Sequence, residues 1–314
     1  MIIVSTLSKV SKGVFYGVGL FGLGGVFHFL QIPSLIVGPF SPSLLIQINS
    51  FIVGTVWKTM QYVFEKRKQG KITFSGDRIH DHDSALIISN HRSWSDYYMI
   101  HSVALRRKML DNCKYFVKDS IKWLPFFGWG MWLAGFVFVK RNWLQDQTKI
   151  NKAFASIKKY NTPAWIINYV EGSRCTPQKL ALCQSFARDH GYTVTENVLL
   201  PRTRGFITCV QQFRRSHIKY IYDFTIAYRH KKPNAPFNEA PNLIRIHIDT
   251  LSPEYQFHVH IRRYTIDELP MDEEELSKWL RDRFVEKDQI LNKLKAQWTD
   301  GLEDTEVWEE PVWK

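Results

Sequence analysis

The feature that most constrains how this chain folds is a run of 45 residues without a formal charge, residues 13–57. One membrane-spanning helix needs only about 20 apolar residues, so a run of this length folds back on itself or is broken. Pro33 and the turn Gly38–Pro42 interrupt the run and predict two apolar helices, Val14–Ile32 and Leu44–Trp57. We therefore expect an apolar membrane helical hairpin at the N-terminus.

Basic residues flank this run on both sides. They are Lys9 and Lys12 before it, and Lys58, Lys66, Arg67, Lys68 and Lys71 after it. By the positive-inside tendency, both ends of the hairpin face the cytosol. The second helix has only 14 residues, so a hairpin that enters one leaflet and a pair of tilted spans both stay open. The same run is also compatible with a cleaved signal peptide or with a pair of buried soluble helices.

The charge of the chain is divided unevenly along its length. The 42 basic and 30 acidic residues give a net charge of +12, but residues 267–314 hold 15 of the acids and only 7 of the bases. Residues 1–266 therefore carry 35 bases and 15 acids, a net charge of +20. A body this basic binds phosphate, whether on nucleic acid, on an anionic membrane or on a small molecule, and charge alone does not choose among them.

The composition excludes a disordered chain, because 45% of the residues are hydrophobic and 14% are aromatic. The four cysteines are Cys113, Cys175, Cys183 and Cys209. No two of them form a CxxC pair, so we expect reduced, buried thiols rather than a zinc knuckle or a disulfide framework.

Short apolar runs alternate with helical patterns from residue 72 to residue 250. The expected strands are Ala85–Ser89, Phe136–Val139, Trp165–Tyr169, Ile221–Tyr228 and Leu243–Ile248, and the expected helices are Trp94–Leu110 and Gln147–Tyr160. This order predicts an α/β domain with a mainly parallel sheet flanked by helices. We divide the chain into 1–71 (the hairpin and a basic linker), 72–266 (the α/β domain) and 267–314 (an acidic helical region and tail).

Three further segments have a recognisable pattern. Phe257–Arg263 alternates like a strand, and Asp272–Lys295 is an amphipathic helix with acids first and lysines later, as the helix dipole favours. Trp123–Val139 has no charge and is dense in aromatic residues. Such a segment lies at a membrane headgroup interface or forms a buried hairpin, and both alternatives stay open.

The segment Leu86–Asp96 reads as a strand that turns at His91, with a helix beginning near Ser93. Ligands collect at the carboxyl ends of strands in open α/β sheets, and the turn places His91 there. Asp96, in the first turn of the helix, can fix the tautomer of the imidazole and raise its basicity, as a general base acting on an alcohol requires. Alternatively, Ser93 and Asp96 form only a capping box.

A second apolar strand ends in Glu171-Gly172-Ser173-Arg174. Gly172 lets the backbone approach a ligand, and Arg174 offers a planar guanidinium for bidentate phosphate binding. Arg141 follows another strand end, and the segment Leu199–Phe206 adds Arg202 and Arg204. Each of these basic groups, taken alone, is also compatible with a solvated surface.

Together these segments resemble the glycerolipid acyltransferase family, whose members move an acyl group from acyl-CoA onto a lysophospholipid. The four matching blocks, in the family's order and spacing, are Asn90-His91-x4-Asp96, Phe138–Arg141, Glu171–Arg174 and Leu200-Pro201. Ser173 stands where threonine is commoner, which keeps a hydroxyl. The resemblance covers about residues 80–290. Three parts of it resemble the subgroup of endoplasmic-reticulum lysophosphatidate, lysophosphatidylinositol and lysocardiolipin acyltransferases. They are Leu200–Phe206, Ile221–Thr225, and His260–Arg263 before Glu286–Asp288.

The resemblance implies roles for these residues. His91 would take the proton from the free hydroxyl of the lysolipid while Asp96 orients the ring, and the hydroxyl would attack the thioester without an acyl-enzyme. The residues implied in substrate binding are Arg141, Glu171, Gly172, Ser173, Arg174, Pro201, Arg202 and Arg204. Glu171 is expected to order Arg174 or the acceptor's glycerol. No metal and no cofactor are expected, because acyl-CoA is a co-substrate.

The resemblance also implies a location in the endoplasmic reticulum membrane, with the active site facing the cytosolic leaflet and no nucleic-acid partner. Two alternatives stay open: a CoA-independent transacylase with a phospholipid donor, and a non-enzymatic anionic-lipid-binding membrane protein. A serine lipase is excluded because the chain lacks a GxSxG elbow. His258 and His260 could share a strand face and bind a metal, but no third ligand is near them in the sequence.

Overall fold

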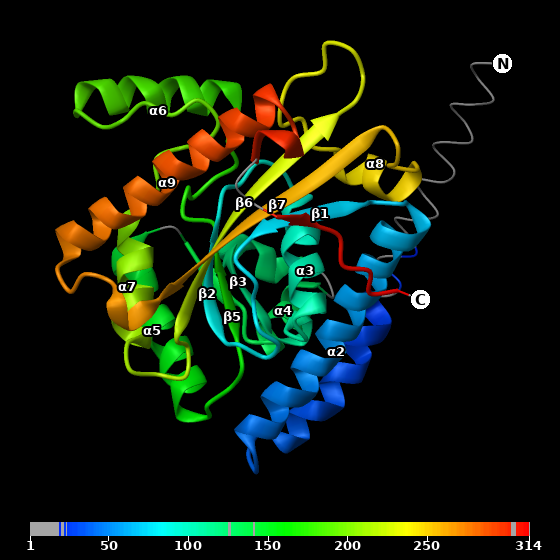
Figure 1. The fold of residues 1–314 in the computed structure, drawn as a ribbon. Coiled ribbons are helices and arrows are strands. Elements are labelled where there is room, and N and C mark those ends of the chain that lie inside the picture. The colour runs from blue at the N-terminus through cyan, green and yellow to red at the C-terminus, as the bar shows by residue number, and fades with distance from the viewer. Residues whose placement is uncertain are drawn as a thin grey trace.

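The computed structural model describes residues 19, 22, 24–124, 127–140, 142–302 and 306–313. Within them, one sheet of eight strands has the order β4-β3-β5-β2-β6-β7-β1-β8 (Figure 1). The strands are β1 (Ile72–Gly76), β2 (Ala85–Ser89), β3 (Cys113–Lys118), β4 (Val137–Val139), β5 (Trp165–Asn168), β6 (Tyr220–His230), β7 (Tyr255–Thr265) and β8 (Val307–Trp308).

Parallel pairing dominates the half of the sheet that carries the predicted site. β2 pairs in parallel with β5 and with β6, and β3 pairs in parallel with β4 and with β5. The long strands β6 and β7 are antiparallel along all of their 11 residues. β1 is parallel to β7, and β8 closes the edge of the sheet as an antiparallel partner of β1. Five of the seven described strand pairings are parallel, so the α/β sheet is mixed, with parallel pairs in the majority.

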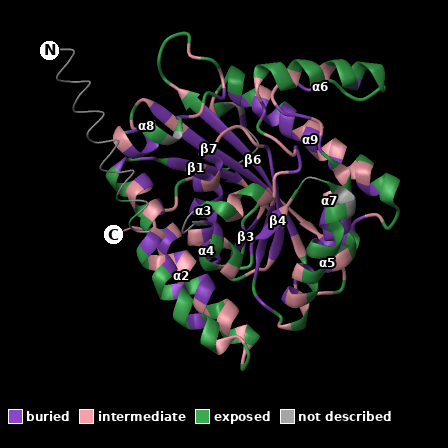
Figure 2. Ribbon diagram, turned by 180° about the vertical axis from the view of Figure 1, so that it is seen from behind, coloured by how far each residue is buried: buried purple, intermediate pink, exposed green. Residues whose placement is uncertain are grey.

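Helices cover both faces of the sheet. The longer ones are α2 (Pro42–Tyr62), α3 (Asp96–Arg106), α5 (Trp143–Lys159), α6 (Pro177–Asp189), α7 (Thr203–Phe213) and α9 (Glu273–Ala296), and the short ones include α4 (Phe127–Leu133) and α8 (Leu243–Ile248). Buried side chains of α3 form one core with one face of the sheet, and those of α5, α7 and α9 form a second core with the other. Figure 2 shows the buried strands between these exposed helical layers. All five residues of β2 are buried, as expected of a central strand covered on both sides.

One predicted strand is wrong, because Leu243–Ile248 forms the helix α8. Its alternation of apolar and polar residues fits one and a half turns of helix as well as a short strand. The side chain of Asn242 decides between them, since it accepts the backbone N–H of Arg245 at 2.8 Å and caps the helix. The predicted helix Asp272–Lys295 is confirmed as α9, and Asp272 caps it through the backbone N–H groups of Glu274 and Glu275.

The predicted membrane hairpin is wrong. Within the described ranges, no helix is both long enough and apolar enough to cross a bilayer. Part of the first segment, Val14–Ile32, lies outside the described residues, and the second, Leu44–Trp57, is part of α2.

The run is uncharged but not uniformly apolar, and its polar side chains serve the fold of the domain. Asn49 is buried in α2 and donates to the hydroxyl of Ser34 at 2.8 Å. Ser50, on the same helix, accepts from the ammonium of Lys114 at 2.8 Å. Gln61, near the end of α2, donates to the carbonyl of Tyr98 in α3 at 3.2 Å. The contacts of Ser50, and of Gln61 just beyond the run, tie α2 to the domain, and that of Asn49 ties it to the preceding segment, because a buried polar group needs a partner.

Candidate active site

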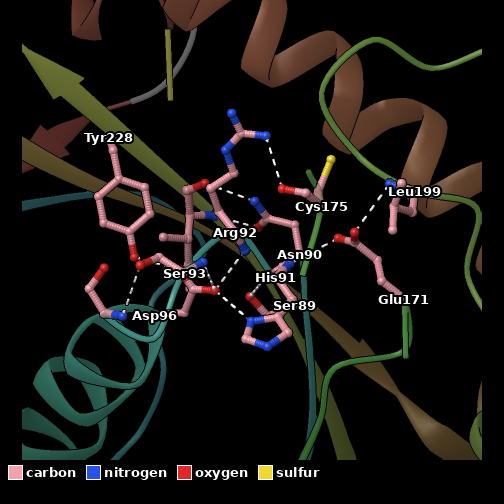
Figure 3. Close-up of polar contacts among 12 residues, drawn as sticks. Ser89, Asn90, His91, Arg92, Ser93, Asp96, Glu171, Cys175, Leu199 and Tyr228 are labelled. Atoms are coloured by element: carbon pink, nitrogen blue, oxygen red, sulfur yellow. Dashed lines mark hydrogen bonds and ion pairs between the residues drawn. The ribbon is translucent and has the colours of Figure 1, made fainter. Parts of the chain in front are cut away.

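The turns that follow β2 and β5 meet at one edge of the sheet. The two strands are parallel neighbours, so His91 and Glu171, which come shortly after them, lie close together. The backbone N–H of His91 donates to Oε1 of Glu171 at 2.9 Å, and the carbonyl of His91 accepts from the backbone N–H of Cys175 at 2.7 Å. Figure 3 shows these groups around the end of β2.

Asn90 fastens the same turn to β6. Its side-chain amide donates to the carbonyl of Ile226 at 2.9 Å, and its side-chain oxygen accepts from the N–H of Ile226 at 2.8 Å. Asn90 is buried, so both of these hydrogen bonds are shielded from water. The backbone that carries His91 is therefore fixed from both neighbouring strands.

His91 and Asp96 form the pair that the sequence predicts. Nδ1 of His91 lies 2.7 Å from Oδ2 of Asp96, and the carboxylate is 1% exposed while the imidazole is 22% exposed. The carboxylate accepts the Nδ1 proton, which leaves Nε2 as the nitrogen available to another molecule. Such a pair can take a proton from a hydroxyl.

Asp96 is held by more than the histidine. Its Oδ2 also accepts the backbone N–H groups of Arg92 at 2.7 Å and Ser93 at 3.0 Å, and its Oδ1 accepts the hydroxyl of Tyr228 at 2.6 Å. Half of the alternative capping box is therefore present, because Asp96 accepts the N–H of Ser93, while the hydroxyl of Ser93 accepts the N–H of Ser95 at 3.3 Å. The carboxylate also bonds to His91, so Asp96 is more than a cap.

Two tyrosines that the sequence analysis missed complete this arrangement. Burial, reinforced by Asp96, raises the pKa of Tyr228 well above its ordinary value, so its hydroxyl stays protonated and donates. The ring of Tyr169 stacks on the imidazole of His91, with 4.1 Å between the ring centroids and 21° between the planes. This contact restricts the rotation of the imidazole. Neither tyrosine lies close to His91 in the sequence, because Tyr169 directly follows β5 and Tyr228 belongs to β6. No local pattern therefore identifies them.

Glu171 lies beneath the site as a link between main-chain segments. It is 3% exposed, and its Oε2 accepts from the N–H of Leu199 at 3.2 Å while its Oε1 accepts from His91. Burial raises the pKa of Glu171 to about 8, although the two backbone N–H groups lower it. The carboxyl group thus joins the turns after β2 and β5 to the segment that enters α7.

A cleft of about 660 Å³ opens beside His91. Four more of the predicted site residues line it: Gly172, Pro201, Arg202 and Arg204. Lining residues that the sequence analysis missed include Lys118, Phe186, Tyr192 and Arg281. They come from β3, from α6, from the turn after α6 and from α9, and only the tertiary fold brings these elements together.

The cleft is cationic. Lys118, Arg202, Arg204 and Arg281 line it, and among the described residues none of the four has an ion-pair partner. Asp146 is the acidic lining residue, but it is 3% exposed and its carboxylate accepts two backbone N–H groups, those of Lys140 and Asn142. Unpaired guanidinium groups in a cleft attract and bind phosphate.

Gly172 has a φ of +71°, a conformation that favours glycine. A Cβ atom at this position would lie 2.8 Å from both Cδ and Nε of Arg202. The backbone N–H of Arg202 donates to the carbonyl of Val170 at 2.7 Å. Gly172 therefore makes room for the arginine side chain, a closer approach than any larger residue permits.

Two other predicted binding residues, Ser173 and Arg174, do not line the cleft as described. Arg174 is exposed, and its guanidinium carbon lies 5.4 Å from the ring centroid of Trp94, away from the described lining of the cleft. Ser173 is half-buried beside it. Arg141 lies outside the described residues.

The helix α9 anchors this region from the C-terminal part of the chain. Lys287 is buried, pairs with Asp223 and donates to the carbonyl of Phe224 at 2.8 Å. The next residue, Asp288, accepts the backbone N–H groups of Glu196 and Asn197, which precede the segment Leu199–Arg202. Consecutive residues of α9 thus hold both β6 and the turn that leads into the cleft.

Across the described part of the chain, no group of three or more His, Cys, Asp or Glu side chains is arranged to hold a metal ion. His258 is hydrogen-bonded at 2.8 Å to the hydroxyls of both Thr73 and Ser75, and His260 is bonded to Ser75 at 2.9 Å. Burial lowers the pKa of His258 to about 3 and that of His260 to about 4, so both are neutral. They form part of the interior of the sheet.

Comparison with protein families gives two matches along the chain. The model described as Acyltransferase matches residues 71–229, and the model described as Acyltransferase C-terminus matches residues 252–307. The first covers the strands that carry His91 and Glu171, and the second covers β7 and α9.

Several curated proteins are similar to this chain. The probable 1-acyl-sn-glycerol-3-phosphate acyltransferase 5 of Arabidopsis thaliana is 34% identical over 77% of this chain and 62% of its own length. The 1-acyl-sn-glycerol-3-phosphate acyltransferase 2 of Brassica napus is 32% identical over 88% of this chain and 70% of its own length. Lysocardiolipin acyltransferase 1 of Gallus gallus is 30% identical over 90% of this chain and 73% of its own length. The chain thus spans less than two thirds of the Arabidopsis relative.

A solved structure has a related fold. The crystal structure of the 1-acyl-sn-glycerophosphate (LPA) acyltransferase PlsC from Thermotoga maritima aligns with a TM-score of 0.52 and 14% sequence identity. The alignment covers 95% of this chain and 99% of that one. At this level of identity the likeness concerns the fold alone.

Proposed function

Because the chain belongs to the glycerolipid acyltransferase family, we propose that it transfers a fatty acyl group from acyl-CoA to the free hydroxyl of a lysophospholipid, with lysophosphatidate as its acceptor. The acceptor is taken from relatives named 1-acyl-sn-glycerol-3-phosphate acyltransferases. Lysocardiolipin is an alternative acceptor, taken from the name of the Gallus gallus relative.

The observation that carries this proposal is the His91–Asp96 pair. Nδ1 of His91 lies 2.7 Å from Oδ2 of Asp96, and His91 lines the cationic cleft. In the proposed reaction, Nε2 of His91 takes the proton of the acceptor hydroxyl as the oxygen attacks the thioester carbonyl. The new C–O ester bond forms, the C–S bond breaks, and His91 returns the proton to the departing CoA thiolate. The products are a phospholipid and CoA, with no acyl-enzyme between them.

Arg202 and Arg204 are proposed to bind the phosphate of the acceptor. Both line the cleft with His91. In lysophosphatidate the phosphate and the reacting hydroxyl share one glycerol. The cation that binds this phosphate must therefore lie close to His91, the general base. Two neighbouring guanidinium groups suit such a dianionic phosphate. Roles for Arg141 and Arg174 stay predictions.

We also propose that the protein contacts a membrane surface. Large apolar side chains are exposed on the N-terminal segment and on the segment containing α4. They include Phe29, Ile36, Phe40 and Phe51 in the first, and Trp123, Trp129 and Trp132 in the second.

The two segments adjoin, because Gln31 donates to the carbonyl of Gly130 at 3.2 Å and His28 packs edge-on against Trp129. An exposed apolar patch that contains tryptophans is typical of an interface with lipid. The cytosolic leaflet of the endoplasmic reticulum is the proposed membrane, on the strength of the family resemblance. Fractionation of cells that express the tagged chain tests this location.

An acyl-transfer assay tests the proposed activity. The protein, in mixed micelles, is given labelled oleoyl-CoA and, in separate reactions, lysophosphatidate, lysophosphatidylinositol, lysophosphatidylglycerol or lysocardiolipin. We expect labelled phosphatidate together with an equal amount of free CoA. A parallel reaction replaces oleoyl-CoA with a labelled phospholipid. Product formed only in that reaction would establish the transacylase alternative. Binding of anionic vesicles with no transfer from any donor would establish the non-enzymatic one.

A further inference from the structure

The outer part of the cleft carries three side chains that the proposed chemistry does not use. Phe186 belongs to α6, Tyr192 to the turn after it, and Arg281 to α9, and all three line the cleft. Figures 1 and 2 both show α6 alongside α9 at the edge of the molecule. Phe186 is 49% exposed and Tyr192 is 37% exposed, a large aromatic surface for a site that faces water.

These side chains form a set of aromatic faces with one cation. The rings of Phe186 and Tyr192 have centroids 6.3 Å apart and are inclined by 30°. The guanidinium carbon of Arg281 lies 5.0 Å from the centroid of Tyr192. His190 stacks on Phe186 at 3.9 Å and extends the aromatic surface. Aromatic faces stack on purine bases, and a neighbouring guanidinium binds phosphate.

Arg281 lies on α9 at an offset from Lys287, the residue that anchors this helix to β6. Lys287, on the same helix, donates to the carbonyl of Phe224, and Phe224 is the register partner of Ser89, which closely precedes His91. Arg281 comes six residues before Lys287, which corresponds to about 9 Å along the helix axis. We therefore expect a ligand bound at Arg281 to reach the reacting atoms through an extended arm.

This requirement distinguishes the two substrates. The phosphate of lysophosphatidate is attached to the glycerol that reacts, so it belongs near His91. Acyl-CoA carries an adenosine 3′-phosphate and a diphosphate at the far end of the pantetheine arm from the thioester. We propose that Phe186, Tyr192 and Arg281 bind the adenosine 3′-phosphate end of the acyl-CoA donor. The assignment rests on the proposed function, because it needs a CoA thioester as donor.

Truncated donors test the assignment. Initial rates are measured with oleoyl-CoA, oleoyl-3′-dephospho-CoA and oleoyl-S-pantetheine at fixed lysophosphatidate. For Arg281→Gln we expect the KM for oleoyl-CoA to rise about tenfold or more, because the variant loses one charge-assisted hydrogen bond to the 3′-phosphate. The KM values for the dephospho donor and for lysophosphatidate should stay at the parent's values. Tyr192→Leu should raise the KM for both nucleotide donors and leave that for oleoyl-S-pantetheine unchanged.

Arg188→Gln is the matched control, because Arg188 is an exposed arginine of α6 that does not line the cleft as described. It should leave all three donors unaffected. An equal rise in KM for all three donors in the Arg281→Gln protein would overturn the assignment. A rise for lysophosphatidate alone would instead assign Arg281 to the acceptor.

A binding measurement separates failure of this assignment from failure of the proposed function. Calorimetry with adenosine 3′,5′-bisphosphate should show binding to the parent and to His91→Ala, and binding at least about tenfold weaker to Arg281→Gln. If the parent transfers oleoyl from CoA but binds the bisphosphate no better than Arg281→Gln does, only the nucleotide site is refuted. If the parent neither uses any thioester nor binds the bisphosphate, the acyl-CoA donor itself is refuted.

Discussion

The hydroxyl of Tyr228 donates a 2.6 Å hydrogen bond to Oδ1 of Asp96, while Oδ2 of the same carboxylate accepts from Nδ1 of His91. The orientation of the histidine thus depends on a side chain of β6, 132 residues beyond Asp96 in the chain. Tyr228 does not line the described cleft. We therefore regard it as a positioning residue that acts through Asp96.

Tyr228→Phe should lower kcat by about tenfold and leave both KM values near those of the parent, because it leaves one oxygen of a buried carboxylate without its donor. The steady-state kinetics of acyl transfer check this. Tyr222→Phe is a matched control, since Tyr222 is also fully buried on β6 and its hydroxyl donates to Asp83 at 2.8 Å. Both variants should lose stability, but only Tyr228→Phe should lose turnover. Equal loss of kcat in the two would remove the positioning role.

His91→Ala should reduce kcat by about 10² to 10⁴, the contribution of a positioned general base. The variant should keep its folded far-ultraviolet circular dichroism, because the imidazole is partly exposed and its loss creates only a small surface hollow. His80→Ala, at an exposed histidine away from the cleft, should retain full activity. A folded His91→Ala protein with the turnover of the parent would contradict the proposed mechanism.

Glu171 makes stability depend on pH. Burial raises its pKa from 4.5 to about 8, so the folded protein holds this proton more tightly than the unfolded chain does. The resulting stabilisation is complete below about pH 4.5 and is lost as the pH rises through 8. In Glu171→Gln this contribution is absent. Urea denaturation at pH 5 and pH 8 should therefore show a larger fall in the free energy of unfolding for the parent than for the variant. An identical fall in both proteins would show that Glu171 does not titrate in this range.

Much of the central sheet could be predicted from local patterns, because its strands are continuous apolar runs bounded by turns. The predicted strand Ala85–Ser89 has the same bounds as β2, and the predicted strand Trp165–Tyr169 is one residue longer than β5. The errors arose where one pattern fits two structures. Leu243–Ile248 suits a strand or a helix until a cap is considered, and the uncharged run that contains Leu44–Trp57 hides polar side chains that belong to the domain.

The candidate site was predictable where its residues are close in sequence. His91 and Asp96 are separated by one turn, so their spacing alone brings them together. Tyr228 and Arg281 could not be found in this way, since each reaches the site through tertiary packing of β6 or α9. The role of Arg174 stays a prediction: its block suggests a phosphate ligand, and its side chain lies over Trp94 in this structure.

Gly172→Ala should raise the KM for lysophosphatidate about tenfold, because the new methyl group displaces the side chain of Arg202 and weakens one charge-assisted contact with phosphate. The φ of +71° at Gly172 also disfavours alanine, so the variant should lose about 1–2 kcal/mol of stability.

Gly135→Ala controls for the backbone strain at Gly172. Gly135 has a φ of +79°, and a Cβ there would meet nothing nearer than a side-chain carbon of Lys114 at 3.9 Å. Both variants should unfold at lower urea concentration, but only Gly172→Ala should change the KM for lysophosphatidate. If the two raise that KM equally, backbone strain rather than the displaced guanidinium accounts for the loss, and the assignment of Arg202 to the acceptor phosphate fails.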